Sequence, residues 1–392
     1  MNTERRRTRV VRVGMNGTPG GVGTRFKILA EHHNREEIEL SVIYIGRADM
    51  FGAQISKLGV PVYELNAATT DLRGLSFGGV VKLLTLLQRI NPDVVHSSIG
   101  TANFISSVSG RLQALRTLGR RKPYLVTEEV SIPERKLLSR MKFMVSHRLC
   151  DRVIAVSNAT KRYLIVKELA KPSKVQVVPN TYPTPFEATL ERQRNYPSDA
   201  EPFRVLMVSR LSEEKNHRFA LNEFARAEKM SSLSLELHIA GNGGHMQSLL
   251  EATAASLGVQ DKVKFLGFRS DVQELMTNAD LYLLPSTTES FGIALVEAMR
   301  CKVPVLASAV GGLPEVMEGY PEGHLLPLEE GVWADAIVRV AHMSLADRQK
   351  IGEEGFDLAG QRYSPTRYVR DLEKLYIGAP SSSSLRSDRR II

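Results

Sequence analysis

Short runs of apolar residues recur along the first half of the chain, and segments with the apolar spacing of a helix, such as Gly79–Ile90, separate them. Strands that alternate with helices are typical of a parallel sheet with helices on both faces. The pattern therefore predicts a doubly wound α/β domain. The predicted strands of this half are Val10–Met15, Ile38–Ile45, Val94–Val95, Tyr124–Val126 and Arg152–Val156.

The alternation stops at Pro183–Glu201, a segment rich in Pro, Glu, Thr, Arg and Asn that is typical of a linker. It then starts again, which predicts a second Rossmann-like domain in series with the first. The expected domains are residues 1–185 and 200–361. A Ser-rich segment near the end, residues 379–392, has no periodicity and is expected to be disordered. The strands predicted for the second domain are Phe203–Val208, Leu235–Ala240, Val263–Leu266, Leu281–Leu284 and Val303–Ala307.

Length and composition agree with a two-domain enzyme, because 392 residues exceed the usual size of one hydrophobic core. No apolar run is long enough to cross a membrane, and no apolar signal core follows the N-terminal arginines, so we expect a cytoplasmic protein. Cys150 and Cys301 are the only cysteines. They are too few for a disulfide framework or a cysteine-built metal site, which favours small core residues.

Charge is distributed unevenly along the chain. Residues 1–195 carry 31 Lys and Arg against 16 Asp and Glu, whereas the remaining residues carry 21 against 27. A basic half indicates an anionic partner, such as a membrane surface, a lipid phosphate or a nucleic acid. No nucleic-acid-binding motif accompanies the charge, so we expect no nucleic acid partner.

Two glutamates, Glu289 and Glu297, stand eight positions apart where an apolar run ending at Pro285 becomes a loop and then a helix. Carboxylates at the end of a buried strand and on the next helix can meet two parts of one polar ligand, and a sugar nucleotide has hydroxyls that suit strong acceptors. The segment resembles the E-x7-E motif of retaining glycosyltransferases with the GT-B fold, especially glycosyltransferase family 4.

A second segment, Val208–Asn216, follows the first strand of the second domain. Arg210 offers a planar guanidinium and Lys215 a point charge, which together can neutralise a diphosphate and stabilise it as it departs. The segment resembles the family's G-R-L-x-x-x-K-G pattern, with Arg210 and Lys215 matching its two diphosphate-binding cations. Ser209 and Asn216 stand where that pattern has glycines.

A glycine-rich loop, Gly20-Gly21-Val22-Gly23, lies between the first predicted strand and a predicted helix. Backbone amides and a helix N-terminus can meet an anion there. The spacing fits neither a P-loop nor the G-x-G-x-x-G pattern of dinucleotide-binding proteins. It resembles the family's Gly-Gly-x-Gly loop, which implies that Gly20, Gly21 and Gly23 face the donor phosphates and the acceptor. A tight turn that serves only the fold is the alternative.

The resemblance covers nearly the whole chain and implies the GT-B fold, with two Rossmann-like doubly wound parallel-sheet domains facing a cleft. It also implies a terminal helix, residues 362–378, that crosses back to the first domain. It assigns the transferred sugar to Glu289 with the amides around Ser290, Phe291 and Gly292, and the ribose to Glu297. The remaining candidates are Asn242, Phe268 and Arg269 for donor binding, His96 beside the donor sugar, and Glu129, which replaces a family histidine, for the acceptor.

The segment Pro133–Cys150 reads as an amphipathic helix with cations on one side. An aromatic ring among cations suits the headgroup region of an anionic membrane. A solvated face of an ordinary core helix is an equally open alternative. The candidate membrane or acceptor residues on this helix are Arg135, Lys136, Arg140, Lys142 and Phe143.

These features predict a hexosyltransferase that moves a sugar from a nucleotide-sugar donor, with UDP favoured, to a lipid-linked or cell-envelope glycan. No Asp-x-Asp signature is present, so we expect no metal cofactor. Peripheral attachment to the inner face of a membrane is compatible with the basic half. A catalytically silent binding subunit and a nucleotide-sugar epimerase remain the alternatives.

Overall fold

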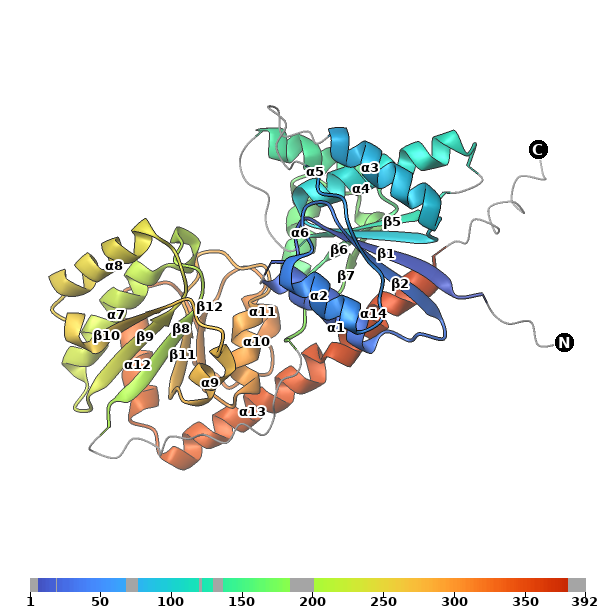
Figure 1. The fold of residues 1–392 in the computed structure, drawn as a ribbon. Coiled ribbons are helices and arrows are strands. Elements are labelled where there is room, and N and C mark those ends of the chain that lie inside the picture. Colours follow the sequence, from blue (N-terminus) through green and yellow to red (C-terminus); the bar gives the residue numbers. More distant parts are fainter. Residues whose placement is uncertain are drawn as a thin grey trace. The chain divides into compact units, whose positions relative to one another are not determined.

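The computed structural model describes residues 6–18, 20–67, 77–119, 122–129, 137–183 and 201–379. The chain divides into two compact units (Figure 1). The first consists of Met1–Pro183 with Pro365–Ile392, and the second is Thr184–Ser364. The predicted linker after Pro183 and the predicted tail from residue 380 onward lie outside the described residues.

The first unit contains a parallel seven-stranded sheet with the order β3-β2-β1-β4-β5-β6-β7. Strand order reverses between β1 and β4, so the chain leaves their carboxyl ends in opposite directions and opens a crevice where ligands of such folds bind. The strands are β1 (Thr8–Gly14), β2 (Ile38–Tyr44), β3 (Val62–Glu64), β4 (Val94–Ser98), β5 (Tyr124–Glu129), β6 (Arg152–Ala155) and β7 (Val175–Val177).

Helices cover both faces of this sheet, because right-handed crossovers place the helices of the two winding directions on opposite sides. Apolar residues of α1, α2 and α14 form one core layer, and those of α3 to α6 form the other. The helices are α1 (Gly21–His32), α2 (Asp49–Lys57), α3 (Phe77–Ile90), α4 (Gly100–Arg116), α5 (Leu137–Leu149), α6 (Asn158–Val166) and α14 (Pro365–Ile377), with a 3-10 turn, η1 (Pro172–Lys174).

The second unit has a parallel six-stranded sheet with the order β10-β9-β8-β11-β12-β13, and its switch point lies between β8 and β11. Its strands are β8 (Phe203–Val208), β9 (Leu235–Ala240), β10 (Val263–Gly267), β11 (Leu281–Leu284), β12 (Val305–Ser308) and β13 (Leu325–Leu326). Its helices are α7 (His217–Met230), α8 (His245–Ser256), α9 (Val272–Thr277), α10 (Ile293–Arg300), α11 (Leu313–Val316), α12 (Val332–Ala341) and α13 (Leu345–Tyr363), with 3-10 turns η2 (Glu213–Lys215) and η3 (Gln260–Lys262).

Proline separates the last two helices. α13 ends at Tyr363 and α14 begins at Pro365, because a residue that precedes proline is disfavoured in helical geometry, whereas proline itself is well suited to the first helical position. α14 packs on the first unit, where Tyr368, Leu372 and Tyr376 join the core layer of α1 and β1. The first sheet is therefore completed by a helix from the far end of the chain.

Candidate functional site

Lys215 and Glu289 meet at the switch point of the second sheet. Lys215 ends η2, which follows β8, and Glu289 follows β11; the Lys215 Nζ lies 2.5 Å from the Glu289 Oε2. The two loops are also joined through their backbones, since the Thr287 amide donates to the Glu214 carbonyl at 2.9 Å. The topology thus brings together two of the residues that sequence motifs singled out separately.

The turn after β12 holds the backbone of Glu289. The Gly312 amide donates to the Glu289 carbonyl at 2.9 Å. Gly311 has a φ of +56°, and a Cβ there would lie 1.9 Å from the same carbonyl oxygen. Only glycine fits such a conformation at such a close approach. The Gly-Gly turn therefore determines where Glu289 points.

Glu297 lies on α10, one turn after the helix begins. Burial raises the pKa of its carboxyl to about 7, against an ordinary value of 4.5. No hydrogen-bond partner of its carboxyl is found among the described residues. A half-buried carboxyl without a protein partner can accept hydrogen bonds from ligand hydroxyls, which compensate for the water it has lost.

The N-terminus of α10 lies beside this pair of glutamates. Gly292 caps the helix with a φ of +87° and no side-chain cap, so the first amides of α10 have no capping side chain. Phe291 is buried, and its ring meets Tyr363 edge to face. Ser290 and Phe291 can thus offer backbone amides to an anion, whereas the Phe291 ring belongs to the core.

Arg210 does not join the pair of Lys215 and Glu289. Its exposed guanidinium lies 3.0 Å from Glu214. Asn216 takes the left-handed conformation, with a φ of +58°, so it serves the family's glycine position with the residue that tolerates that conformation best after glycine. His217, whose Nε2 lies 3.0 Å from the Ser209 hydroxyl, and Glu214 are two members of this loop that the motif did not reveal.

Two further loops end β9 and β10 at the same edge of the sheet. Gly241 is needed for packing, because a Cβ there would lie 1.7 Å from the Ser209 carbonyl oxygen. Asn242 is exposed, and its carbonyl accepts from the Leu211 amide. Phe268 has 69% of its surface exposed, and Arg269 pairs with Asp271. An exposed ring at this edge is available to stack on a base.

A hollow of about 540 Å³ in this unit lies at α7 and α8. It shares Ser212, Glu213 and Asn216 with the loop after β8. It contains none of the donor-site candidates Arg210, Lys215, Glu289 and Glu297. Size alone therefore does not identify the chemical site of the second unit.

In the first unit, the glycine-rich loop lines a hollow of about 240 Å³. Gly20 is the N-cap of α1. Gly20, Gly21 and Gly23 all line the hollow, together with Ser98 and Ile99 from the end of β4 and the residue after it. Gly23 also has a packing role, since a Cβ there would lie 2.3 Å from the ring of Phe51 on α2. The loop therefore serves both the fold and an open hollow.

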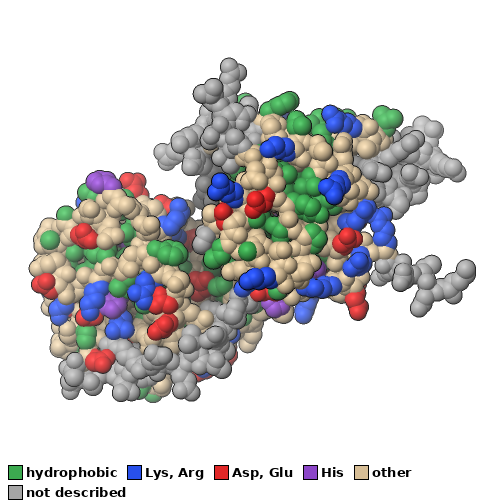
Figure 2. Space-filling model, viewed as in Figure 1, with side chains coloured by type: hydrophobic (Ala, Val, Ile, Leu, Met, Phe, Trp, Pro, Cys, Tyr) green, Lys and Arg blue, Asp and Glu red, His purple; other side chains and the backbone are tan. Residues whose placement is uncertain are grey.

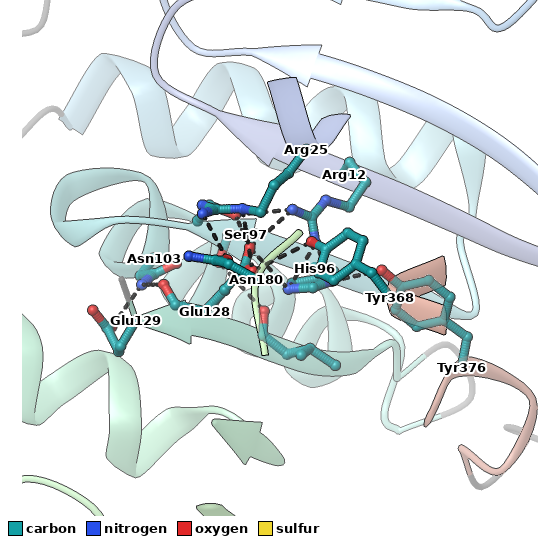
Figure 3. A network of polar contacts seen from close by, with 12 residues as sticks. Arg12, Arg25, His96, Ser97, Asn103, Glu128, Glu129, Asn180, Tyr368 and Tyr376 are labelled. Carbon is teal, nitrogen blue, oxygen red and sulfur yellow. Dashed lines mark hydrogen bonds and ion pairs between the residues drawn. The ribbon is translucent and has the colours of Figure 1, made fainter. Parts of the chain in front are cut away.

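The predicted strand Val94–Val95 continues to Ser98, so His96 lies within β4, and it is fully buried (Figure 3). Its Nδ1 lies 2.6 Å from the Tyr376 hydroxyl, and its ring also contacts Arg12. Burial and the Arg12 charge hold the pKa of His96 well below its ordinary value. The ring is neutral and fully buried, so a contact of His96 with the donor sugar is left to its backbone and stays a prediction.

The same network joins several segments of the first unit around Glu128 (Figure 3). Arg12 Nη2 lies 3.0 Å and Arg25 Nε 3.4 Å from its carboxylate. Arg25 also donates to Asn180, the residue shortly before the chain leaves this unit, at 3.0 Å. Burial alone would raise the pKa of Glu128, but the two guanidinium groups outweigh it and hold that pKa well below its usual range. Sequence reasoning missed this network because its members come from segments that lie far apart in the chain.

Glu129 is buried rather than open to an acceptor. Its Oε1 accepts from Asn103 Nδ2 at 2.7 Å and lies 2.9 Å from His147 Nε2. Burial raises its pKa. The acceptor contact expected from its position at the end of β5 is therefore not available to this carboxylate as it stands, because its polar contacts are all internal.

The membrane-facing role expected for Phe143 is also wrong. Phe143 is buried in the core layer of α3 to α6, and its ring meets His147. The opposite residue, Met141, is exposed. Arg140 is exposed and Lys142 half-buried, and Arg135 and Lys136 lie outside the described residues. The buried residues of α5 also include the polar Ser146 and His147, which the hydrophobic pattern did not identify.

The described residues contain neither a cluster that could hold a metal ion nor a helix that could span a membrane. No group of three or more His, Cys, Asp or Glu side chains is placed to hold a metal ion. No described helix is long and apolar enough to cross a membrane.

Two protein families match the chain, one in each unit. Residues 19–184 match "Glycosyltransferase Family 4", and residues 189–357 match "Glycosyl transferases group 1". Together the matches span most of the sequence, and each falls on one Rossmann-like unit.

Characterised relatives include "N-acetyl-alpha-D-glucosaminyl L-malate synthase" of Bacillus anthracis, 29% identical over 58% of this chain and 59% of that protein. The match thus spans less than two thirds of the Bacillus protein. The "Phosphatidylinositol N-acetylglucosaminyltransferase gpi3 subunit" of Schizosaccharomyces pombe is 28% identical over 83% of this chain and 70% of that protein.

Solved structures of the same fold include Anabaena Alr3699/HepE in complex with UDP-glucose, with a TM-score of 0.74, 22% identity, and coverage of 94% of this chain and 98% of that one. The lipopolysaccharide outer core galactosyltransferase WaaB superposes with a TM-score of 0.67 at 17% identity, over 94% and 99% of the two chains. The fold, the loops at the switch point of the second sheet and the two family matches agree: this chain is a glycosyltransferase that belongs to family 4 and has the GT-B fold.

Proposed function

We propose that the protein transfers a sugar from a UDP-sugar to a lipid-linked or other cell-envelope glycan, with retention of the anomeric configuration. The observation that carries the proposal is the arrangement of Lys215, Glu289 and Glu297 at the switch point of the second sheet. A cation, a carboxylate beside it and a second, unpartnered carboxylate match the diphosphate, sugar and ribose of one donor molecule.

Each residue has a separate task in this scheme. Lys215 neutralises the diphosphate, and Arg210 joins it once its guanidinium has left Glu214. The N-terminal amides of α10 add the positive end of a helix dipole. Glu289 accepts hydrogen bonds from the sugar, and Glu297 accepts them from the ribose. The bond from the anomeric carbon to the donor phosphate breaks while the acceptor oxygen bonds on the same face, and the departing phosphate takes the acceptor proton.

UDP is favoured as the donor nucleotide by two kinds of support. The Anabaena structure of the same fold was determined with UDP-glucose. The names of the Bacillus and yeast relatives describe transfer of N-acetylglucosamine. Phe268, exposed at the end of β10, is the residue that we assign to stacking on the uracil.

The acceptor proposal is supported by the basic first half of the chain, which suits a phosphate-bearing acceptor at the inner face of a membrane. The name of the yeast relative includes phosphatidylinositol, and that of the structurally similar WaaB includes the lipopolysaccharide outer core. We place the acceptor at the hollow lined by Gly20, Gly21 and Ser98.

The test is calorimetric titration of the protein with UDP, GDP and ADP, repeated with Arg210→Ala and Glu297→Ala. We expect UDP to bind most tightly and both substitutions to weaken it. Lys302→Ala, which removes an exposed lysine paired with Glu353, is the matched control. Absence of binding by all three nucleotides would contradict the proposal and favour a catalytically silent subunit.

Stereochemistry and reaction type need a second measurement. Proton NMR of the product formed from UDP-sugars and lipid extracts should show the anomeric configuration of the donor. Donor conversion without transfer to any acceptor would instead indicate an epimerase.

A further inference from the structure

Three helices, α3, α4 and α5, form a continuous layer on one face of the first sheet, with α4 between the other two (Figure 1). These helices contain no Asp or Glu. Such a composition gives the layer a positive field with no internal carboxylates to cancel it. Their basic residues are Lys82, Arg89, Arg111, Arg116, Arg140, Lys142 and Arg148.

The outer side of this layer also exposes large apolar side chains. Leu112, Leu115 and Leu118, spaced three residues apart along α4 and the turn after it, are 37%, 71% and 88% exposed. The layer holds seven of the fifteen large exposed hydrophobic residues in the part of the chain that the structure describes, the others being Phe77, Val81, Met141 and Val145. Single exposed apolar residues need no explanation, but a gathering on one layer indicates an interaction surface.

Cations on the same layer are free to meet an anionic partner. Arg89, Arg116, Arg140 and Arg148 are exposed, and none has a carboxylate partner among the described residues. Arg111, in contrast, is bound to Asp151 at 2.8 Å. Figure 2 shows hydrophobic and Lys or Arg side chains side by side over the part of the first unit where Figure 1 places α3 and α4.

We propose that this face, the outer side of α3, α4 and α5, docks onto an anionic lipid bilayer. The leucines enter the boundary between headgroups and acyl chains, while the arginines bind lipid phosphates. A second copy of the chain is a poor occupant, because two such faces would bring like charges together. Leucine stripes likewise do not suit a nucleic acid, whose bases stack on aromatic rings. This proposal rests on the proposed function, because the membrane is where a lipid-linked acceptor is presented. The docking face replaces the one that the sequence predicted around Phe143.

The test is co-sedimentation of the full chain with vesicles of phosphatidylcholine alone or mixed with phosphatidylglycerol. We expect binding only to the mixed vesicles, weaker at high salt. Leu115→Ser with Leu118→Ser should lower the partition coefficient at least about tenfold. Arg116→Gln with Arg148→Gln should lower it about fivefold for each arginine. Leu249→Ser, at a leucine 48% exposed on α8 of the second unit, is the matched control and should change nothing.

Three outcomes would overturn the proposal: no binding to mixed vesicles, binding that neither double variant reduces, or a dimer in light scattering that the leucine variant converts to a monomer. UDP titration of the same variants separates this proposal from the proposed function. Lost vesicle binding with unchanged UDP affinity is the expected result for the double variants. Vesicle binding by a protein that binds no nucleotide would contradict the proposed function but support the docking surface.

Discussion

The ammonium of Lys215 and the carboxylate of Glu289 lie 2.5 Å apart although 74 positions separate them in the chain. The pair forms because β8 and β11 are parallel neighbours in the sheet, so the loops that follow them lie at the same edge. Without a donor, each charge compensates the other. A bound diphosphate would compete with Glu289 for Lys215, so the pair holds the cation in place and must loosen when the donor arrives.

Substitutions of Lys215 and of Glu289 should affect different steps, donor binding for the first and sugar transfer for the second. Lys215→Ala should weaken UDP binding by at least about tenfold, because a charge-assisted hydrogen bond to the diphosphate contributes about 1.5–3 kcal/mol. Glu289→Gln should not weaken UDP binding, because it removes the carboxylate that competes for Lys215, but it should lower the transfer rate about a hundredfold or more. Calorimetry with UDP and a transfer assay measure the two effects; equal losses in both assays for both variants would contradict the separate roles.

The pH dependence of folding should report Glu297. Its pKa in the folded protein, about 7, exceeds the ordinary 4.5, so folding favours the protonated form and stability falls as pH rises from 4.5 through 7. Glu297→Gln removes this cost and should raise the free energy of unfolding above pH 7 by up to about 3 kcal/mol. Urea unfolding at pH 8 and pH 4 checks this, since the gain should vanish at the lower pH.

The affinity for UDP should also depend on the protonation of Glu297, but here the ionised carboxylate is the favoured form. The ionised form of Glu297 is the better acceptor for ribose hydroxyls, so UDP affinity should fall as pH drops below about 7. In Glu297→Gln this fall should disappear between pH 8 and pH 6. A fall of the same size in the variant would assign the titration to another group.

Glu128 should have the reverse linkage to stability. Its folded pKa is depressed, so its contribution is present above the ordinary pKa of 4.5 and is lost as pH falls below that value. Glu128→Gln leaves Arg12 and Arg25 buried without a counter-charge and should cost about 3–5 kcal/mol at pH 7. Glu31→Gln, which removes a partly exposed i,i+4 pair with Lys27 on α1, should cost less than about 1 kcal/mol. Chemical unfolding of both variants at pH 7 and pH 4 makes the comparison, and a similar cost for both at pH 7 would contradict the role of the network.

The turn that holds Glu289 can be tested with two glycines that share a positive φ. Gly311→Ala places a Cβ 1.9 Å from the Glu289 carbonyl and should abolish transfer by displacing that loop. Gly258→Ala has a φ of +72° but no atom within 4 Å of the new Cβ, so it should cost only the backbone strain of about 1 kcal/mol. Transfer assays on the two soluble variants separate the steric effect from the backbone effect.

The sequence predicts the strands well where they are continuous apolar runs. Phe203–Val208 and Leu235–Ala240 were expected with the bounds that β8 and β9 have. Parallel sheets buried on both faces require such runs, so their signal does not depend on tertiary detail.

The polar interior could not be predicted in this way. Arg12 and His96 lie in strands that read as ordinary apolar runs interrupted by a polar residue, and nothing local shows that both meet Tyr376. Likewise, α5 buries Ser146 and His147, so its hydrophobic pattern assigned Phe143 to the wrong side. In each position a tertiary hydrogen bond overrides the local preference for water.

The contact between His96 and Tyr376 has a consequence for synthesis of the protein, because 280 residues separate the two side chains. Every residue of the second unit leaves the ribosome before α14 does. The second unit can therefore fold as soon as it emerges, whereas the first unit lacks α14, and with it part of the cover on the α1 and α2 side of its sheet, until α14 has also emerged. The N-terminal half is made first and completed last, and a chaperone that shields β1 and α1 during this interval would act on the stage at which the nascent chain is most exposed to aggregation.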